Sequence, residues 1–190
     1  MYHFFVEPHQ IGAEEIRNEG ADVNHIRNVL RMKPGEEILI SSREGGDYFC
    51  RVEELEPEYV SAKILEEWEN KELPARIHLF QGLPKGDKME LIIQKAVELG
   101  AYRVVPVSMK RSVVKLDAKK ADAKRKRWNA VSESAAKQSK RSLIPEVAPL
   151  MTYKEAVKEA AGYDMVLLPY ESADGIRKTR ELLASVKPGT

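Results

Sequence analysis

Basic side chains are the residues of this sequence whose number and spacing point most directly to chemistry. Residues 110–141 contain 12 lysines and arginines and three carboxylates, a net charge of +9. The rest of the chain holds 19 basic and 27 acidic residues, a net charge of −8, although the whole protein carries only +1. Because each phosphate that a cation neutralises releases condensed counterions, this segregation favours a polyanionic partner, and a solvated helix face is the alternative.

The end of this basic segment, residues 137–142, combines Lys137, Lys140 and Arg141 with glutamine and serine. Short polar side chains suit contacts with phosphate and sugar oxygens, so this end is a candidate contact with nucleic acid. Trp128 interrupts the basic run. Its i, i+3, i+7 spacing with apolar residues predicts a core position rather than a surface on which bases stack.

A second candidate anion site is the stretch Gly82–Lys88, which joins a predicted strand to a predicted helix. The backbone N–H groups at a helix start, with Lys85 and Lys88 beside them, could bind a phosphate, although a plain strand-to-helix turn also fits. The stretch matches neither the Walker A loop nor the G-x-G-x-x-G pattern, which disfavours ATPases and the common dinucleotide oxidoreductases.

Several other chemistries are disfavoured by residue counts. Cys50 is the single cysteine and sits in an alternating run, so an inert strand position is expected and no internal disulfide can form. The four histidines have no metal-ligand spacing, so no metal is expected. No stretch approaches the roughly 20 apolar residues that cross a bilayer and the start lacks a signal-peptide pattern, so we expect a cytoplasmic protein without membrane contact.

The first 70 or so residues are predicted to form short strands and one helix, which would position some of the basic side chains. Alternating apolar residues predict strands at Tyr2–Val6, Glu37–Ser42, Tyr48–Glu53 and Tyr59–Leu65, with Gly45-Gly46 as a hairpin turn. The stretch Asp22–Arg31 reads as a helix capped by Asp22, which leaves Arg27, Arg31 and Lys33 on its opposite side or in its exit loop. These elements predict a compact β-barrel with one helix.

The later residues alternate between strand and helix after a charged boundary at 66–74. Strands are predicted at 76–81, 103–108 and 164–169, the last of them buried on both faces, and helices at 87–99, 118–139, 153–161 and 176–186. Asp87 with Glu90, and Thr152 with Glu155, have the spacing of capping boxes. The alternation predicts an α/β fold with a mostly parallel, doubly wound sheet, which binds ligands beyond the carboxyl ends of its strands.

Six stretches in order along the chain resemble the RsmE-type 16S ribosomal RNA uridine-N3 methyltransferases of the SPOUT class. The stretches are His25–Gly35, Gly82–Glu90, Gln94–Gly100, Arg111–Lys115, Arg127–Trp128 and Glu133–Arg141. The resemblance implies an N-terminal PUA-like RNA-binding β-barrel at 1–72 and a C-terminal SPOUT-type parallel α/β domain at 74–190. It also implies S-adenosylmethionine as cofactor, 16S rRNA in the 30S subunit as substrate, and a homodimer.

The resemblance assigns roles to individual residues of this sequence. Expected RNA contacts are Arg27, Arg31, Lys33, Lys85, Lys88, Lys137, Lys140 and Arg141. Arg111 and Arg141 become the catalytic candidates, as electrostatic aids rather than bases because arginine stays protonated in proteins. The stretch Leu168-Pro169-Tyr170-Glu171 matches the adenosine-side segment of the cofactor pocket. No general base is assigned.

The sequence departs from the family pattern after residue 190. Family members continue into a strand, a Gly-Pro-Glu-Gly-Gly loop and a segment that closes the knot, whereas the one Gly-Gly here is Gly45-Gly46. We therefore expect these residues to stop before the glycine-rich cofactor loop, to leave the knot incomplete and to be inactive alone.

Two other functions stay open at this point. A non-catalytic RNA-binding or ribosome-assembly module needs only the barrel and the basic segment. A nucleotide-binding metabolic enzyme would bind its ligand with little dependence on salt, whereas RNA binding weakens steeply as salt rises.

Overall fold

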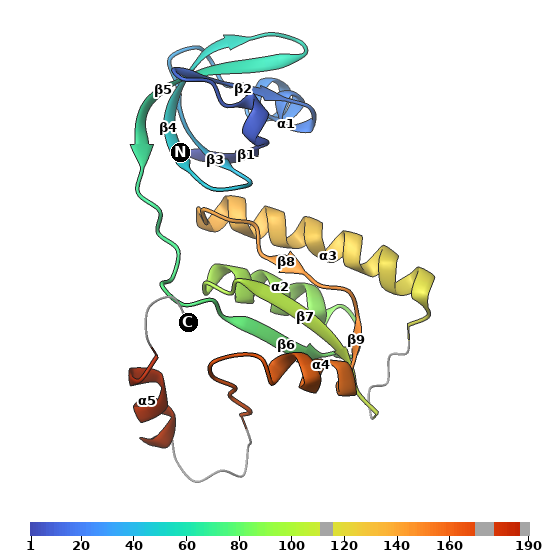
Figure 1. Ribbon diagram of the computed structural model, residues 1–190. Coiled ribbons are helices and arrows are strands. Elements are labelled where there is room, and N and C mark those ends of the chain that lie inside the picture. Colours follow the sequence, from blue (N-terminus) through green and yellow to red (C-terminus); the bar gives the residue numbers. More distant parts are fainter. Residues whose placement is uncertain (111–115, 170–176, 187–190) are drawn as a thin grey trace. The chain divides into compact units, whose positions relative to one another are not determined.

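The structure is a computed structural model, which describes residues 1–110, 116–169 and 177–186 (Figure 1). Its residues form two compact units. Unit 1 comprises Met1–Glu72 and Glu133–Ile144, and unit 2 comprises Leu73–Ser132 and Pro145–Thr190. Unit 1 thus includes residues 133–144, which the sequence leads us to expect in the second domain. The domain limits of 1–72 and 74–190 stay a prediction.

Unit 1 is built on a five-stranded sheet in the order β1-β3-β4-β5-β2. The strands are β1 (Tyr2–Val6), β2 (Glu15–Glu19), β3 (Glu37–Ser42), β4 (Asp47–Leu55) and β5 (Tyr59–Trp68), and a short helix, η1 (Pro8–Gln10), follows β1. β1 is parallel to β3 and the other pairs are antiparallel. The four predicted strands are confirmed, and Gly45 and Gly46 turn the chain between β3 and β4 with φ of 119° and 95°.

Strand β2 was not predicted, because one apolar residue, Ile16, alternates with charged and amide side chains. Its inward face carries Ile16 and Asn18, both buried. Ile16 belongs to a hydrophobic core that includes Phe4, Ile26 and Cys50. Burial raises the pKa of the Cys50 thiol to about 12, which confirms an inert strand position for the single cysteine.

The helix of unit 1 differs from the prediction of a single helix over Asp22–Arg31. It begins after Gly20 (φ 80°) as α1 (Ala21–Asn24) and continues as a wider π-helical segment, η2 (His25–Val29), before Arg31 adopts a φ of 53°. Asp22 was wrongly predicted as the cap: it lies inside α1, and its carboxylate accepts hydrogen bonds from Lys137 instead.

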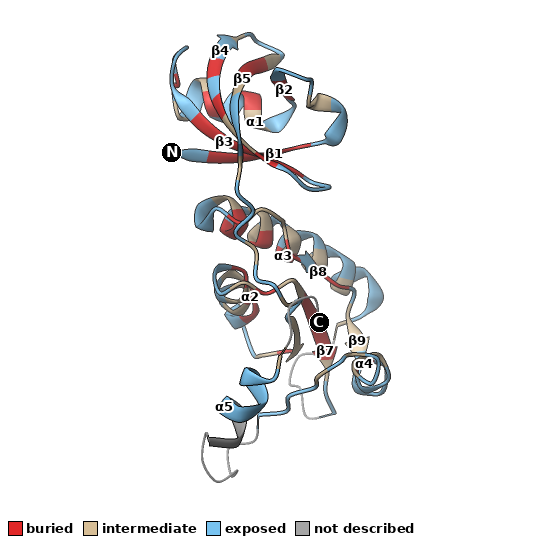
Figure 2. Cartoon of the chain, turned by 60° about the vertical axis from the view of Figure 1, so that its left-hand side comes forward, coloured by how far each residue is buried: buried red, intermediate tan, exposed pale blue. Residues whose placement is uncertain are grey.

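Unit 2 contains a parallel sheet in which β7 is central. Its strands are β6 (His78–Gly82), β7 (Arg103–Ser108), β8 (Glu146–Val147) and β9 (Met151–Thr152); β7 pairs with each of the other three. Helices α2 (Lys88–Glu98) and α4 (Tyr153–Ala160) lie on opposite faces of β7 (Figures 1 and 2). One further helix, α5 (Arg177–Ala184), follows. This parallel α/β arrangement confirms the predicted fold class.

Helix α3 (Ala118–Ser139) spans the predicted residues, and Trp128 is buried as expected. Helix α2 precedes α3 in the sequence, and its apolar stripe is buried at Met89, Ile93 and Val97. Thr152 and Glu155 form the predicted capping box of α4. The predicted capping box of α2 is wrong: Asp87 stands at the N-cap but its side chain accepts no capping hydrogen bond. The carboxylate of Glu90 accepts a hydrogen bond from Arg127.

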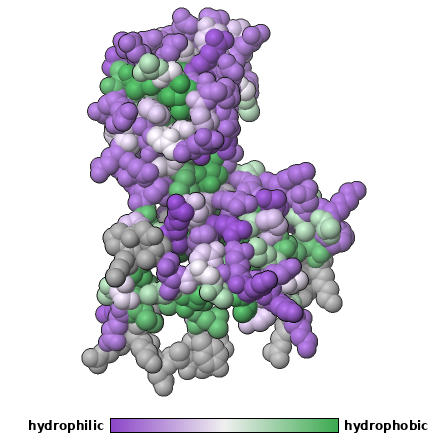
Figure 3. All heavy atoms as spheres, in the orientation of Figure 1, coloured by the Kyte–Doolittle hydropathy of each residue, from purple (hydrophilic) through white to green (hydrophobic). Residues whose placement is uncertain are grey.

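The strand predicted at 164–169 is wrong. These residues form no strand, and Val166, Leu167 and Leu168 are 58%, 45% and 87% exposed. An apolar run is buried on both faces only when it joins a sheet whose faces other elements cover, and 164–169 joins no sheet among the described residues. Hydrophobic side chains therefore reach the surface of unit 2 (Figure 3). No helix in the described part of the chain is long and apolar enough to cross a membrane.

Candidate functional site

The loop between β6 and α2 places two predicted phosphate contacts at the carboxyl end of β6. Lys85 and Lys88 are both exposed, and no carboxylate of the described residues lies within ion-pair distance of them. Gly86 takes a φ of 71° and brings the loop onto the start of α2. Exposed ammonium groups beside a helix N-terminus at this edge of a parallel sheet attract anions.

The first turns of α3 are less cationic than their composition predicts. Arg127 donates to Glu90 (Nη2–Oε2, 2.9 Å) and Arg125 to Glu146 (Nη2–Oε1, 3.1 Å). Lys126 pairs with Asp122 one turn earlier on the helix (Nζ–Oδ2, 3.1 Å). The protein's own carboxylates therefore neutralise part of the +9 segment.

The C-terminal end of α3 is tied to unit 1 by ion pairs. Lys137 lies 3.0 Å from both carboxylate oxygens of Asp22 and 3.3 Å from Glu133. Arg141 is buried, and its Nε lies 2.9 Å from both oxygens of Glu72, while its Nη2 also donates to Glu72. The N–H of Ser142 donates to the same carboxylate at 2.8 Å. Charge-assisted bonds of this kind fasten residues 137–142 to the rest of unit 1.

Lys140 differs from both of its basic neighbours. It is exposed, it adopts a φ of 57° just after α3 ends, and none of the described carboxylates forms an ion pair with it. With Lys137 it lines a hollow of about 390 Å³ in unit 1, which we call the basic hollow. Burial, followed by the charges of Lys137 and Lys140, lowers the pKa of His3 in this hollow to about 4, so its ring is neutral at pH 7.

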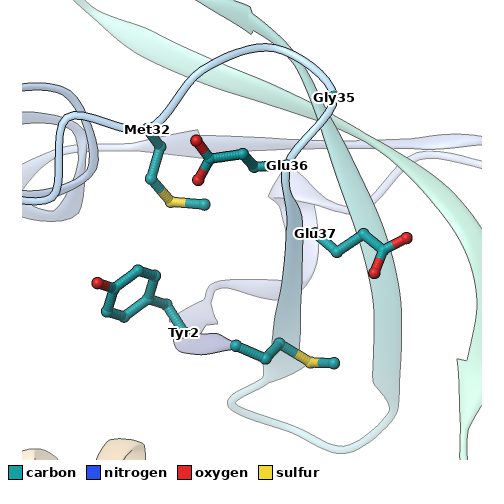
Figure 4. Close-up of a pocket in the computed structure, with 6 residues that line it drawn as sticks. Tyr2, Met32, Gly35, Glu36 and Glu37 are labelled. Atoms are coloured by element: carbon teal, nitrogen blue, oxygen red, sulfur yellow. The ribbon is translucent and has the colours of Figure 1, made fainter.

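Three predicted RNA contacts lie around helix η2 and its exit. Arg27 is half-buried in η2, whereas Arg31 and Lys33 are exposed. Glu36 accepts a hydrogen bond from the N–H of Lys33 and lines, with Glu37, a second hollow of about 440 Å³, which we call the acidic hollow. Figure 4 shows the ring of Tyr2 and the side chain of Met32 facing this space. Glutamates beside Arg31 and Lys33 weaken the local attraction for phosphate.

The residues expected to hold the cofactor are only partly described. Leu168 and Pro169 are exposed in an irregular segment, and Leu168 is 87% exposed. Tyr170, Glu171 and Arg111 lie outside the described residues. A site for an adenosine group needs an enclosed, largely apolar pocket, and Leu168 and Pro169 do not form one as they stand.

The structure brings together residues that sequence reasoning missed. Glu72 pairs with Arg141 across 69 positions of the chain, and His3 bonds Ser41 across 38. No local pattern marks such partners, because their contact depends on how the sheet and the end of α3 come together. The one sequence signal for the His3–Ser41 contact was the polar pair Ser41-Ser42 at the end of an apolar strand. Such a pair is equally typical of a turn.

Comparison with known proteins identifies both parts of the chain. Residues 71–188 match the family described as "RNA methyltransferase domain", and residues 19–65 match "RNA methyltransferase PUA domain". The chain is 38% identical over 178 residues to ribosomal RNA small subunit methyltransferase E of Bacillus subtilis, which covers 91% of this chain and 69% of that protein. The Mycobacterium tuberculosis protein of the same name is 30% identical, with 83% and 62% covered.

Two solved structures are similar to this chain in both sequence and fold. A crystal structure of a hypothetical protein matches with a TM-score of 0.90 at 37% identity and covers 99% of this chain and 77% of that one. A ribosomal RNA small subunit methyltransferase E from Neisseria gonorrhoeae, bound to S-adenosyl methionine, matches with a TM-score of 0.73 at 34% identity, with 84% and 66% covered. The chain thus spans about two thirds of the length of these named relatives. It belongs to the ribosomal RNA small subunit methyltransferase E family.

Proposed function

We propose that the protein acts in the cytoplasm as a homodimeric methyltransferase that moves a methyl group from S-adenosylmethionine to N3 of a uridine in the 16S rRNA of the 30S subunit. Family membership supports the reaction class, and the Neisseria relative bound to S-adenosyl methionine supports the cofactor. The observation that carries the RNA substrate is the pair of exposed lysines, Lys85 and Lys88, at the carboxyl end of β6.

The chemistry that falls to the protein's own residues is positioning and charge stabilisation. N3 lies on the Watson–Crick edge of uracil, so the uridine must be unpaired before it can react. Cations at the carboxyl end of the sheet would hold the RNA backbone and stabilise negative charge on the base as its N3 proton leaves. Lys85 and Lys88 are proposed for this role. Arg31, Lys33 and Lys140 of unit 1 are proposed as further contacts with the RNA.

Arg111 and Arg141 no longer stand as equal catalytic candidates. The buried pairing of Arg141 with Glu72 supports a structural role for this guanidinium in unit 1. Arg111 follows β7 in the sequence and is kept as the proposed electrostatic aid. The stretch 168–171 is kept as the proposed adenosine-side segment.

The test is methyl transfer from labelled S-adenosylmethionine to 30S subunits that lack the modification. Mass spectrometry of the digested 16S rRNA should find the label on N3 of one uridine, and label on another atom or on protein would overturn the proposed reaction. The replacements Lys85→Gln and Lys88→Gln should raise the KM for 30S subunits, whereas Lys63→Gln on β5 serves as an exposed control. The inactivity expected for the 190 residues alone stays a prediction, which the same assay decides.

A second candidate is a non-catalytic RNA-binding or ribosome-assembly module. The exposure of Leu168 favours it, because a residue of the adenosine pocket should be covered. Equilibrium dialysis with labelled S-adenosylmethionine separates the two candidates, since the module predicts RNA binding without cofactor binding. Sedimentation velocity tests the proposed homodimer, for which the exposed Val157, Val166 and Leu168 of unit 2 offer apolar surface.

A further inference from the structure

The basic hollow of unit 1 has the size and lining of a ligand site. Its volume of about 390 Å³ lies within the range of small-molecule sites. Strand β1, helix η2 and the end of α3 line it. Its polar and aromatic lining residues include Tyr2, His3, His25, Lys137, Gln138 and Lys140, and no carboxylate belongs to its lining.

A buried hydrogen-bond acceptor without a partner lies in this lining. His3 Nε2 lies 2.7 Å from Ser41 Oγ, and the Ser41 hydroxyl donates its one proton to Asp47. His3 Nε2 must therefore be the donor to Ser41, which leaves Nδ1 of the neutral ring as an acceptor. His3 is 5% exposed, and its Nδ1 has no hydrogen-bond partner among the described residues. An unmet buried acceptor of this kind is costly unless a donor is supplied from outside.

The mouth of the hollow supplies charge and ring faces. Lys140 offers an ammonium group that none of the described carboxylates neutralises, whereas Lys137 is held by Asp22 and Glu133. Tyr2 is 49% exposed and His25 is exposed, with its ring 6.2 Å from that of Phe4 in an edge-on contact. Aromatic faces beside a cation are the elements that bind unpaired bases and their phosphates.

We propose that the basic hollow binds one unpaired ribonucleotide of the RNA, with its base on the ring of Tyr2 or His25, its phosphate at Lys140, and a base N–H or ribose O–H donating to His3 Nδ1. This proposal rests on the proposed RNA substrate and adds a nucleotide subsite on unit 1 that is separate from the lysines of the β6–α2 loop. The acidic hollow also contains Tyr2, but its Glu36 and Glu37 would repel the phosphate.

The test uses the full 190-residue chain, uridine 5′-monophosphate and a short single-stranded RNA as probes. Three single variants address the three contacts: Tyr2→Ala for stacking, Lys140→Gln for the phosphate, and His3→Leu for the acceptor. Leucine has no acceptor, whereas a glutamine would keep one in its amide oxygen. Lys63→Gln, an exposed lysine on β5 of the same unit, is the matched control.

Tyr2→Ala should weaken binding of the RNA by about 5-fold to 100-fold, the usual range for loss of one base–aromatic stack. Lys140→Gln should weaken it and reduce its dependence on salt, and Lys63→Gln should leave it unchanged. The ¹⁵N resonance of His3 Nδ1 should move when uridine 5′-monophosphate is added to the wild-type protein. A merely structural role for His3 would leave this resonance in place.

Two results would overturn the subsite: wild-type binding by both Tyr2→Ala and Lys140→Gln, or a His3 Nδ1 resonance that no nucleotide moves. Thermal unfolding of each variant identifies loss of binding that comes from loss of folding, and the His3 resonance needs no variant at all. Methyl transfer by the wild type with no nucleotide effect at His3 would reject the subsite and keep the proposed function. A nucleotide effect at His3 together with methyl label on another atom or on protein would keep the subsite and reject the proposed reaction.

Discussion

Arg141 and Lys140 are adjacent cations with opposite surroundings. Arg141 is buried against Glu72 and holds the end of α3 in unit 1, whereas Lys140 is exposed and has no ionic partner among the described residues. Lys137 resembles Arg141, and Lys85 and Lys88 of unit 2 resemble Lys140. The protein thus divides its basic residues into internal cations, Lys137 and Arg141, and surface cations, Lys85, Lys88 and Lys140.

This division changes what the charge count of the basic segment means. A net charge of +9 predicts one continuous surface for a polyanion, but part of that charge is already balanced within the fold. Internal cations affect stability, since removing one leaves a carboxylate unpaired, while surface cations affect affinity and its salt dependence. Each class therefore has its own measurable effect.

The largest effect is expected at Arg141. Arg141→Met leaves the largely buried Glu72 carboxylate without its cation and should lower the free energy of unfolding of unit 1 by about 3–5 kcal/mol. Lys140→Met, one residue earlier, should change it by less than about 0.5 kcal/mol. Native-state hydrogen exchange of the β3 and β4 amides measures unit 1 directly. The double variant Arg141→Met/Glu72→Leu should recover most of the loss, and equal losses for Arg141→Met and Lys140→Met would erase the distinction between the two classes.

A pH-dependent effect comes next, at His3 beside the internal cations. The folded protein holds the pKa of His3 at about 4, against an ordinary value of 6.5, through burial and then the charges of Lys137 and Lys140. Between these two values the unfolded chain binds a proton that the folded chain does not. Stability contributed by the neutral ring is therefore complete above pH 6.5 and is lost as the pH falls towards 4, by at most about 3 kcal/mol.

Urea unfolding between pH 7 and pH 4 of wild type, His3→Gln and the exposed-site control His9→Gln measures this effect. His3→Gln should flatten the fall in stability, and His9→Gln should leave it in place. An unchanged fall in His3→Gln would assign the acid sensitivity to other groups.

Local patterns predicted the elements of this fold better than the ion pairs. The limits of β3, β7 and α3 follow from alternation or from length and helical composition, and each agrees with the structure to the residue. The prediction of a buried strand at 164–169 failed because burial depends on elements from elsewhere in the chain that pack against the run, which a local pattern does not show. Asp22 was taken as a local cap when its partner, Lys137, lies 115 residues away.

The candidate site shows the same limit. Exposed Lys85 and Lys88 were found from a loop motif, because a strand, a glycine and a helix start are all local features. Whether Lys140 or Arg141 faces solvent was not predictable, since both have the same composition around them. The decisive residue is Glu72, and only the folded chain brings it to Arg141.

A smaller effect is expected at the surface cations of the β6–α2 loop. The double variant Lys85→Gln/Lys88→Gln should reduce the slope of log K against log salt for single-stranded RNA by about 1.4, because each phosphate contact contributes about 0.7. Its free energy of unfolding should stay within about 0.5 kcal/mol of wild type, as surface substitutions usually do. Fluorescence titration with labelled RNA at several salt concentrations measures the slope. An unchanged slope would remove this loop from the RNA footprint.

The smallest effect is expected at Lys126, which has an ionic partner and is nevertheless on the surface. Its pair with Asp122 spans one helical turn, and the two side chains are 79% and 58% exposed. Solvent and salt screen such a pair, so Lys126→Ala should cost less than about half a kcal/mol, and even less at high salt. Urea unfolding at low and high salt measures this. A cost comparable to that of Arg141→Met would show that a carboxylate partner, rather than burial, separates the two classes of cation. A small cost would show that burial separates them.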